Sequence, residues 1–401
     1  MATPSKRLSI LLLVLAEMAG MNLWFAAAAV LPDMVREGAI AAGRQALLTS
    51  AVQAGFVVGA LVVSISGIAD RLDPRRVFAV SALLAAAANA ALLVAPLGGD
   101  AAIASRFLAG ALLAGVYPVG MKIAVGWGVR DRGLLVGLLV GALTLGKAAP
   151  YLAAFLGGAA WRPAIVATSL LAGLGGLLVL AVGLGPHHAR SPGFRPGAIR
   201  LAWTDRRIRR ACIGYFGHMW ELFAMWAWVG AAAAASYSVS MDADSAESLA
   251  KLTAFLAIAT GAFACVFAGA LADRIGKAEV TIIAMAVSGA AALLTALSFG
   301  GPVWLTFTLI VVWGIAVIPD SAQFSAIVAD NAPPHLSGSL LTFQTALGFA
   351  LTIATVQATP MLAAAFGWPV VLAAMALGPA AGIVAMRGLT RRVGAARPEP
   401  A

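Results

Sequence analysis

The chain has 401 residues, of which 61% are hydrophobic and only 11% are Asp, Glu, Lys or Arg. Soluble domains carry about 25% charged residues, so an ordinary water-soluble protein is excluded. The 27 Lys and Arg residues exceed the 17 Asp and Glu residues. They fall in short clusters between apolar runs, which indicates an anionic membrane surface as their partner and argues against nucleic acid. Cys212 and Cys265 lie in apolar stretches without metal-ligand spacing.

Apolar runs long enough to cross a bilayer recur along the chain. A helix of about 20 residues spans the hydrocarbon core, and lipid offers no partner for unpaired backbone groups, so helices are expected in place of strands. The first run contains Glu17 and is too long and too polar for a cleaved signal peptide, so we expect it to be retained. We predict twelve spanning helices, over 8–31, 46–68, 75–96, 101–126, 134–156, 163–184, 211–236, 248–271, 278–299, 302–326, 338–361 and 366–387.

The positive residues predict the orientation. Twenty Lys and Arg residues lie at one set of loops and ends, including seven arginines within 190–210, whereas the opposite loops hold four: Arg36, Arg44, Arg162 and Lys251. The excess marks the cytoplasmic side, so both termini and the 185–210 loop are expected in the cytoplasm of a cell with the chain in its inner membrane. Nearly all of these charges are interpreted as solvated helix ends that set the topology.

The chain also resembles two copies of one unit. Motifs recur in the same order at nearly constant offsets: Glu17 and Trp24 as Glu221 and Trp228 at 204, Asp70-Arg71 as Asp273-Arg274 at 203, and Pro118 as Pro319 at 201. Such repeats are typical of transporters built from two pseudo-symmetric bundles. We therefore predict a six-helix bundle over 1–184, a cytoplasmic linker over 185–210, a second bundle over 211–387 and a cytoplasmic tail over 388–401.

The loop after the second span and its repeat carry the most specific motif. The second copy reads Gly-Ala-Leu-Ala-Asp-Arg-Ile-Gly-Lys over 269–277, and the first keeps Asp-Arg but has Ser66 and Asp73 where glycines are usual. These residues resemble the signature of the major facilitator superfamily, and the resemblance covers the whole chain. It implies an all-helical membrane protein of twelve spans and a gating latch formed by Asp70, Arg71, Asp273 and Arg274. The alternative for both aspartates is turn formation.

Two further positions bear on the resemblance. The fourth span begins with Arg106 and Gly110 at the spacing of the family's Arg-x-x-x-Gly pattern. The family's antiporter signature in the fifth span is not matched, since Lys147 stands where an antiporter keeps a small residue. This difference argues against simple drug efflux.

Ionisable side chains within spans cost roughly 2.5–3.5 kcal/mol each on insertion scales, so each needs a reason. Lys147 lies midway along the fifth span, too deep to reach water easily, and is predicted to contact an anionic group of the substrate. Its alternative is a structural ion pair with Glu17 or Glu221. Arg106 is either a second anion contact or an interhelix hydrogen-bond donor, and Lys122 either has a functional role or reaches the inner interface.

Carboxyl groups at repeat-related positions are candidates for proton coupling. Burial favours the neutral form of Glu17 and of Glu221, which therefore suit proton exchange. His218 lies three residues before Glu221 on the same helical face. Asp320 follows Pro319 toward the cytoplasmic side and is expected to release the proton or to pair with Lys122.

The remaining site residues are aromatic. Trp24, Tyr117 and Trp228 are predicted to line the binding pocket, although most aromatic residues of such a chain serve packing. Motifs for nucleotide binding, nucleophilic catalysis or metal hydrolysis are missing from the sequence, so we expect neither an enzyme nor a cofactor or metal. The expected partners are a small-molecule substrate, protons and the lipid bilayer, and we expect a monomer.

Three functions remain open from the sequence. The first is a proton-coupled secondary transporter of a small organic or inorganic anion that works by alternating access, with its site between the two bundles. The second is proton-driven antiport of a hydrophobic or cationic compound. The third is a non-transporting receptor or scaffold on the same fold, because fold alone does not dictate function.

Overall fold

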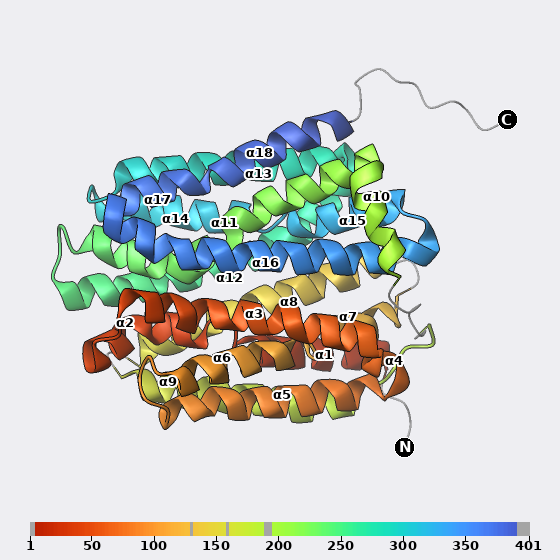
Figure 1. Ribbon diagram of the computed structural model, residues 1–401, viewed down its shortest axis with the longest axis horizontal. Coiled ribbons are helices and arrows are strands. Elements are labelled where there is room, and N and C mark those ends of the chain that lie inside the picture. The colour runs from red at the N-terminus through yellow and green to blue at the C-terminus, as the bar shows by residue number, and fades with distance from the viewer. Residues whose placement is uncertain (1–4, 129–130, 158–159, 188–194, 391–401) are drawn as a thin grey trace.

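The structure is a computed structural model, and it describes residues 5–128, 131–157, 160–187 and 195–390. This part of the chain is helical, with short 3-10 turns between some helices. Figure 1 shows long helices lying side by side, with the first half of the chain in the lower layer and the second half in the upper layer. Most of the predicted tail and five arginines of the predicted positive clusters lie outside the described residues: Arg130, Arg190, Arg391, Arg392 and Arg397.

Six spans come from the first half. The first and fourth are each made of two helices, α1 with α2 and α6 with α7, and α4 is a short helix between the second and third spans. The bounds are α1 Lys6–Met21, α2 Ala26–Gly38, α3 Ala42–Ser66, α4 Ile68–Arg71, α5 Pro74–Ala90, α6 Asp100–Leu113, α7 Tyr117–Val125, α8 Arg132–Leu156 and α9 Trp161–Leu178.

Six more spans come from the second half, after the short helix α10 (Ile199–Thr204) in the predicted linker. The tenth and twelfth are divided, α14 with α15 and α17 with α18. The bounds are α11 Arg206–Tyr237, α12 Ala243–Ile275, α13 Lys277–Ser298, α14 Val303–Val317, α15 Ser321–Asn331, α16 Pro334–Phe366, α17 Trp368–Met375 and α18 Leu377–Met386. The prediction of twelve spans in two six-helix bundles is confirmed.

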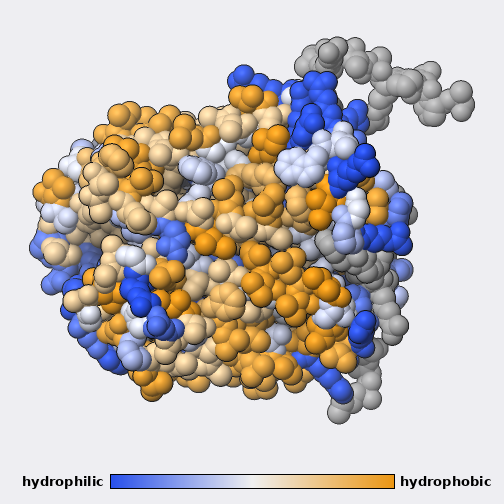
Figure 2. All heavy atoms as spheres, in the orientation of Figure 1, coloured by the Kyte–Doolittle hydropathy of each residue, from blue (hydrophilic) through white to orange (hydrophobic). Residues whose placement is uncertain are grey.

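Eleven of the spans in the described part are long and apolar enough to cross a membrane, judged by length and composition. The remaining one, α11, begins among arginines and carries His218 and Glu221, yet it packs between α12, α16 and α18. Figure 2 shows hydrophobic residues over the middle of one face and hydrophilic residues gathered toward both ends, the pattern expected of a protein surrounded by lipid.

Proline lies at three of the four divided spans, and in the twelfth Pro379 follows the break between α17 and α18. Because proline lacks an N–H and its ring collides with the carbonyl four residues earlier, a helix is interrupted around it. Pro118 follows the break between α6 and α7, and Pro319 lies in the break between α14 and α15. Pro150 and Pro360, in contrast, lie inside the continuous helices α8 and α16.

The two halves meet along α8 with α12, α3 with α16, and α2 with α11. The start of α1 and the end of α18 lie at the same end of the bundle, together with α4, α10 and α15 (Figure 1). We call this the terminal end. The opposite end, which holds the end of α2 and the start of α12, is called the far end.

A close helix contact recurs in the two halves. A Cβ atom on Gly110 of α6 would collide with the Val52 carbonyl of α3, and one on Gly314 of α14 would collide with the Ala257 carbonyl of α12. Small residues let membrane helices approach backbone to backbone. The two glycines are 204 residues apart, the same offset as the predicted repeat, so the repeat extends to packing.

Candidate functional site

The break between α1 and α2 is stabilised by Arg106 of α6. Carbonyl groups at a helix break lack partners within the helix and need other donors. Arg106 donates through Nη2 to the carbonyl oxygens of Leu23 at 2.7 Å and Trp24 at 3.0 Å, and through Nη1 to Oδ1 of Asn89 at 2.7 Å. Its side chain is fully buried. Of the two interpretations of Arg106, this geometry favours the interhelix donor.

Lys147 of α8 lies beside the same break. Its neighbour Gly146 packs against α1, where a Cβ atom would meet the Met18 carbonyl at 2.5 Å, so α8 approaches α1 closely. The Lys147 ammonium lies 4.3 Å from the ring centroid of Trp24 and 4.5 Å from that of Phe223. These are cation–π distances, and they join the first half to the second through one buried side chain.

The rings around Lys147 belong to an aromatic cluster between the halves. The cluster consists of Trp24, Phe25 and Phe56 from the first half and Phe223, Trp226 and Phe349 from the second. Its ring centroids come as close as 4.8 Å across the halves, and all six side chains are buried. In this conformation the rings therefore close the junction around the ammonium.

Glu17 of α1 is buried in the first half. It is fully shielded from solvent, and neither carboxyl oxygen has a hydrogen-bond partner among the described residues. Gly120 of α7 makes room for this carboxyl, because a Cβ atom there would collide with Oε2. Glu17 and Lys147 are near enough to interact electrostatically but do not form an ion pair. Lys147 therefore does not form the alternative structural ion pair with Glu17 in this conformation.

Glu221 has different surroundings from its repeat-related counterpart. Its Oε1 accepts a hydrogen bond from Trp313 Nε1 at 2.6 Å, and its Oε2 accepts one from Ser288 Oγ at 2.9 Å. These partners come from α14 and α13, so Glu221 lies among helices of its own half. Glu221 is therefore held by neutral donors rather than by Lys147.

His218 and Asp320 form a second buried polar pair near Glu221. His218 Nδ1 of α11 lies 2.9 Å from Asp320 Oδ1 at the break between α14 and α15. His218 Nε2 is buried and has no hydrogen-bond partner in the described chain. Asp320 also interacts electrostatically with Glu221, so all three predicted proton-coupling residues of the second half share one neighbourhood. Lys122, the other expected partner of Asp320, is paired elsewhere.

Lys122 of α7 pairs with the gating loop. Its ammonium contacts Asp70 Oδ1 and donates to the Ala69 carbonyl at 2.9 Å. The other three predicted gating residues are exposed: Arg71, Asp273 and Arg274. The structure thus links the latch motif to α7 of its own half, which supports a structural role for Lys122.

The unusual Asp73 of the first motif has a defined role. It caps α5, accepting hydrogen bonds at Oδ1 from the Arg75 backbone at 2.9 Å and from Arg75 Nε at 3.0 Å. The Arg75 guanidinium lowers the pKa of the Asp73 carboxyl, although partial burial opposes the shift. At the equivalent position of the second copy, Gly276 ends α12 with φ +113°, a conformation reserved for glycine.

The three aromatic residues predicted to line the pocket lie in different places. Trp24 lies against Lys147, whereas Trp228 donates to the Val356 carbonyl at 2.9 Å and lines a cavity of about 330 Å³ toward the far end. Tyr117 is half-buried at the start of α7 and interacts electrostatically with Glu17. The structure therefore gathers Trp24, Lys147 and Glu17 but places Trp228 at a different cavity.

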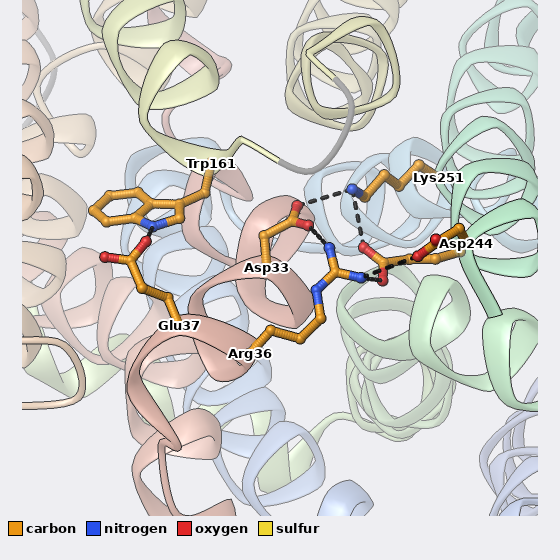
Figure 3. A network of polar contacts seen from close by, with 7 residues as sticks. Asp33, Arg36, Glu37, Trp161, Asp244 and Lys251 are labelled. Carbon is orange, nitrogen blue, oxygen red and sulfur yellow. Dashed lines mark hydrogen bonds and ion pairs between the residues drawn. The ribbon is translucent and has the colours of Figure 1, made fainter.

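The sequence did not reveal an ion-pair network that joins the halves at the far end. Lys251 donates to Asp33 Oδ2 at 2.8 Å, and Arg36 donates to Glu247 Oε2 at 2.5 Å (Figure 3). The sequence predicts that Arg36 and Lys251 are solvated loop charges, and the structure corrects this by pairing both across the halves. Opposite charges three and four residues apart, Asp33 with Arg36 and Glu247 with Lys251, were the available signal.

The comparisons with known proteins assign the family. The family model described as Major Facilitator Superfamily matches residues 12–356. The chain belongs to the major facilitator superfamily. A member of this family is a multi-pass membrane transporter of small molecules and not an enzyme, and that description applies to this chain.

Solved structures share the fold. The xylose transporter XylE from E. coli, in a partially occluded inward open conformation, has a TM-score of 0.73 at 13% identity and covers 97% of this chain and 100% of its own. The nucleoside transporter NupG has a TM-score of 0.73 at 14% identity, with 96% and 100% covered. The proton:xylose symporter XylE with 6-bromo-6-deoxy-D-glucose has 0.69 at 14%, with 96% of each chain covered. No curated protein with significant sequence similarity was found.

Proposed function

We propose that this transporter moves a small organic or inorganic anion together with protons, by alternating access at the junction of its two bundles. The observation that carries the proposal is the buried Lys147 ammonium, which contacts rings from both halves and has no ion-pair partner among the described residues. An unpaired buried charge is unfavourable unless another group neutralises it. An anionic solute supplies that group.

Buried acids support the proton coupling. Glu17 has two carboxyl oxygens without hydrogen bonds next to Lys147, and Glu221 lies near His218 and Asp320. Protonation removes the charge of a buried carboxyl, so such groups suit a cycle in which protons bind and leave. A proton on Glu17 also leaves the Lys147 charge fully available to an anion.

Orientation and gating complete the proposal. The excess of Lys and Arg at the terminal end supports an orientation with both termini in the cytoplasm. The protein is proposed to work as a monomer in the inner membrane. Asp70, Arg71, Asp273 and Arg274 then face the cytoplasm as the inner latch. Three of these residues are exposed and Asp70 pairs with Lys122, whereas ion pairs join the two halves at the far end.

A second candidate function is proton-driven antiport of a hydrophobic cation. Glu17 beside the aromatic cluster favours it, because rings and a carboxylate both attract cations. In that case binding depends on Glu17 and not on Lys147.

Transport in proteoliposomes tests the proposal. Uptake of radiolabelled benzoate, acetate and phosphate is measured under an imposed pH gradient, with ethidium as the cationic probe. We expect anion uptake that Lys147→Met abolishes and Lys147→Arg keeps, while Glu221→Gln abolishes accumulation and retains exchange. Anion transport unchanged in Lys147→Met, ethidium transport alone, or the absence of any transport would each refute it.

A further inference from the structure

We infer that the solute of the Lys147 site is an aromatic monocarboxylate. This inference rests on the proposed anion transport and narrows the anion to one charge on an apolar, ring-sized body. It comes from three features of the junction: the number of cations, the polar groups left without partners, and the character of the walls.

The site offers one positive charge. Lys147 is the cation at the aromatic cluster, since the guanidinium of Arg106 is engaged by the carbonyls of Leu23 and Trp24 and by Asn89. A single ammonium neutralises one negative charge. Phosphate or a dicarboxylate would bring a second charge into a buried site without a second free cation among the described residues, which is strongly unfavourable.

Two further donors without partners belong to rings that contact the ammonium. Nε1 of Trp24 and Nε1 of Trp226 are buried and have no hydrogen-bond partner in the described part of the chain. Their rings lie 4.3 Å and 5.4 Å from the Lys147 ammonium. Buried polar groups are rarely left unpaired. A carboxylate has two oxygens, which accept from an ammonium and from indole N–H groups once these turn toward the solute.

The walls explain the body of the solute. The four phenylalanine rings that complete the cluster present only carbon to the junction: Phe25, Phe56, Phe223 and Phe349. A hydroxyl-rich solute would leave its own polar groups unpaired against these rings, at roughly 1–3 kcal/mol for each. A ring pairs favourably with other rings in tilted or edge-to-face arrangements. The cluster opens only when the halves separate, so the solute replaces ring contacts between the halves.

Ligand-dependent stabilisation of the full-length purified protein tests this inference. Benzoate, cyclohexanecarboxylate, acetate and phosphate are compared, because ligand binding raises apparent stability by mass action. We expect benzoate to stabilise most, with affinity reduced about tenfold or more in Trp226→Phe, which keeps the ring and removes the donor. Lys147→Met should lose the response, and Lys6→Met, whose ion pair with Asp131 lies at the terminal end, should keep it.

The outcomes separate the inference from the proposed function. Stabilisation by phosphate or acetate equal to that by benzoate would overturn the aromatic monocarboxylate and leave anion transport intact. An unchanged benzoate response in Trp226→Phe would also overturn it, and this variant serves if Lys147→Met fails to fold. Binding of none of the anions would overturn both.

A separate observation supports a second inference: we propose that Asp33, Arg36, Glu247 and Lys251 form a reversible latch at the far end. Each cation contacts both carboxylates. Arg36 pairs with Asp33 and Glu247, and Lys251 pairs with Asp33 at 2.8 Å and Glu247 at 3.0 Å. Asp33 and Arg36 belong to α2, whereas Glu247 and Lys251 belong to α12 (Figure 3).

The location of this far-end network indicates its role. Among ion pairs between described residues, those that cross from one half to the other all involve α2 and the start of α12. The Asp33 side chain is 1% exposed and that of Lys251 is 8% exposed, so this pair is shielded from solvent. The cavity lined by Trp228 lies directly against Arg36, Glu247 and Lys251. A solute passing the far end must therefore part these charges.

The charge pattern allows the network to open and close. Each half contributes one carboxylate and one cation of the latch, three or four residues apart on the same helix. Asp244 of α12 also lies 4.0 Å from Arg36, but its side chain is exposed to solvent (Figure 3). When the halves separate, each helix keeps a neutral pair, so opening breaks the contacts between halves without leaving an unpaired charge. Glu37 on α2 differs, because its partner Arg162 belongs to the same half.

Distance measurements between the halves test the latch. Spin labels on Ala42→Cys and Ser240→Cys, both exposed at the far end, report separation in a Cys212→Ser, Cys265→Ala background. We expect Lys251→Met to raise the ratio of long to short distances about tenfold, a coupling typical of close charge pairs. Adding Asp33→Asn should change little more, because its partner across the halves is already gone.

Matched variants decide the outcome. Arg162→Met removes the ion pair between Arg162 of α9 and Glu37 of α2, which lies within the first half. It should leave the distances between the spin labels unchanged. Equal effects of Arg162→Met and Lys251→Met would overturn the latch, as would additive effects of Lys251→Met and Asp33→Asn. If Lys251→Met fails to fold, Arg36→Gln provides the same comparison, since that side chain is 46% exposed.

Discussion

Replacing Arg106 with methionine separates its two interpretations. The change removes three hydrogen bonds from buried acceptors: the carbonyls of Leu23 and Trp24 and the amide oxygen of Asn89. The Leu23 carbonyl keeps the Ala26 N–H at 3.4 Å, so two acceptors are left unpaired, at about 1–3 kcal/mol each or roughly 2–6 kcal/mol in total. Removing a guanidinium from the membrane interior returns about 2.5–3.5 kcal/mol. At the midpoints of these ranges the lost hydrogen bonds exceed the relief, so we expect a destabilisation of about 1 kcal/mol.

The assay compares thermal unfolding of Arg106→Met with that of Arg44→Met. Arg44 forms an exposed ion pair with Asp100, a type of contact that contributes about 0–1 kcal/mol. Amide hydrogen exchange should also rise around residues 22–26 in Arg106→Met, because the break between α1 and α2 loses its donor. Equal stability of the two variants, together with loss of anion binding in Arg106→Met alone, would refute the structural interpretation.

Three further changes have defined outcomes. Gly314→Val should lower the free energy of unfolding by at least about 3 kcal/mol, since the valine side chain would collide with the α12 backbone. Thermal unfolding measures this loss. Gly276→Ala should destabilise by about 1–3 kcal/mol because of its φ of +113°, whereas Gly269→Ala, in open space on α12, should be neutral or slightly stabilising. Asp73→Asn should destabilise the protein at pH 7. The pKa of Asp73 is lower in the folded than in the unfolded state, so its stabilising interaction with Arg75 is fully present above the unfolded pKa and is lost as the pH falls through the folded pKa. The unfolding temperatures of the wild type and of Asp73→Asn should therefore converge in acid.

The spans and the repeat were predictable from the sequence, because the need to satisfy backbone groups in lipid leaves a long apolar run only one regular structure. The positions of the breaks were partly predictable. Pro118 and Pro319 mark interruptions, but Pro150 and Pro360 do not, since neighbouring helices decide whether a proline interrupts a span.

The partners of the buried charges were not predictable. The repeat suggested similar surroundings for Glu17 and Glu221, yet one carboxyl has no hydrogen bond and the other accepts two. Which face of a helix meets which neighbour depends on helix rotation and tilt, and these are set by packing. The spacing of charges within α2 and within α12 was visible in the sequence, but their pairing across the halves required the fold.

The matched glycine contacts have a mechanical consequence. Gly110 fastens α6 to α3, and Gly314 fastens α14 to α12, so tightly that no side chain separates the two backbones of either pair. Both α3 and α12 also contact the opposite half. A displacement at that interface is therefore transmitted to α6 or α14 by rigid-body movement, because the close backbone contact resists bending. This favours movement of each half as a rigid body.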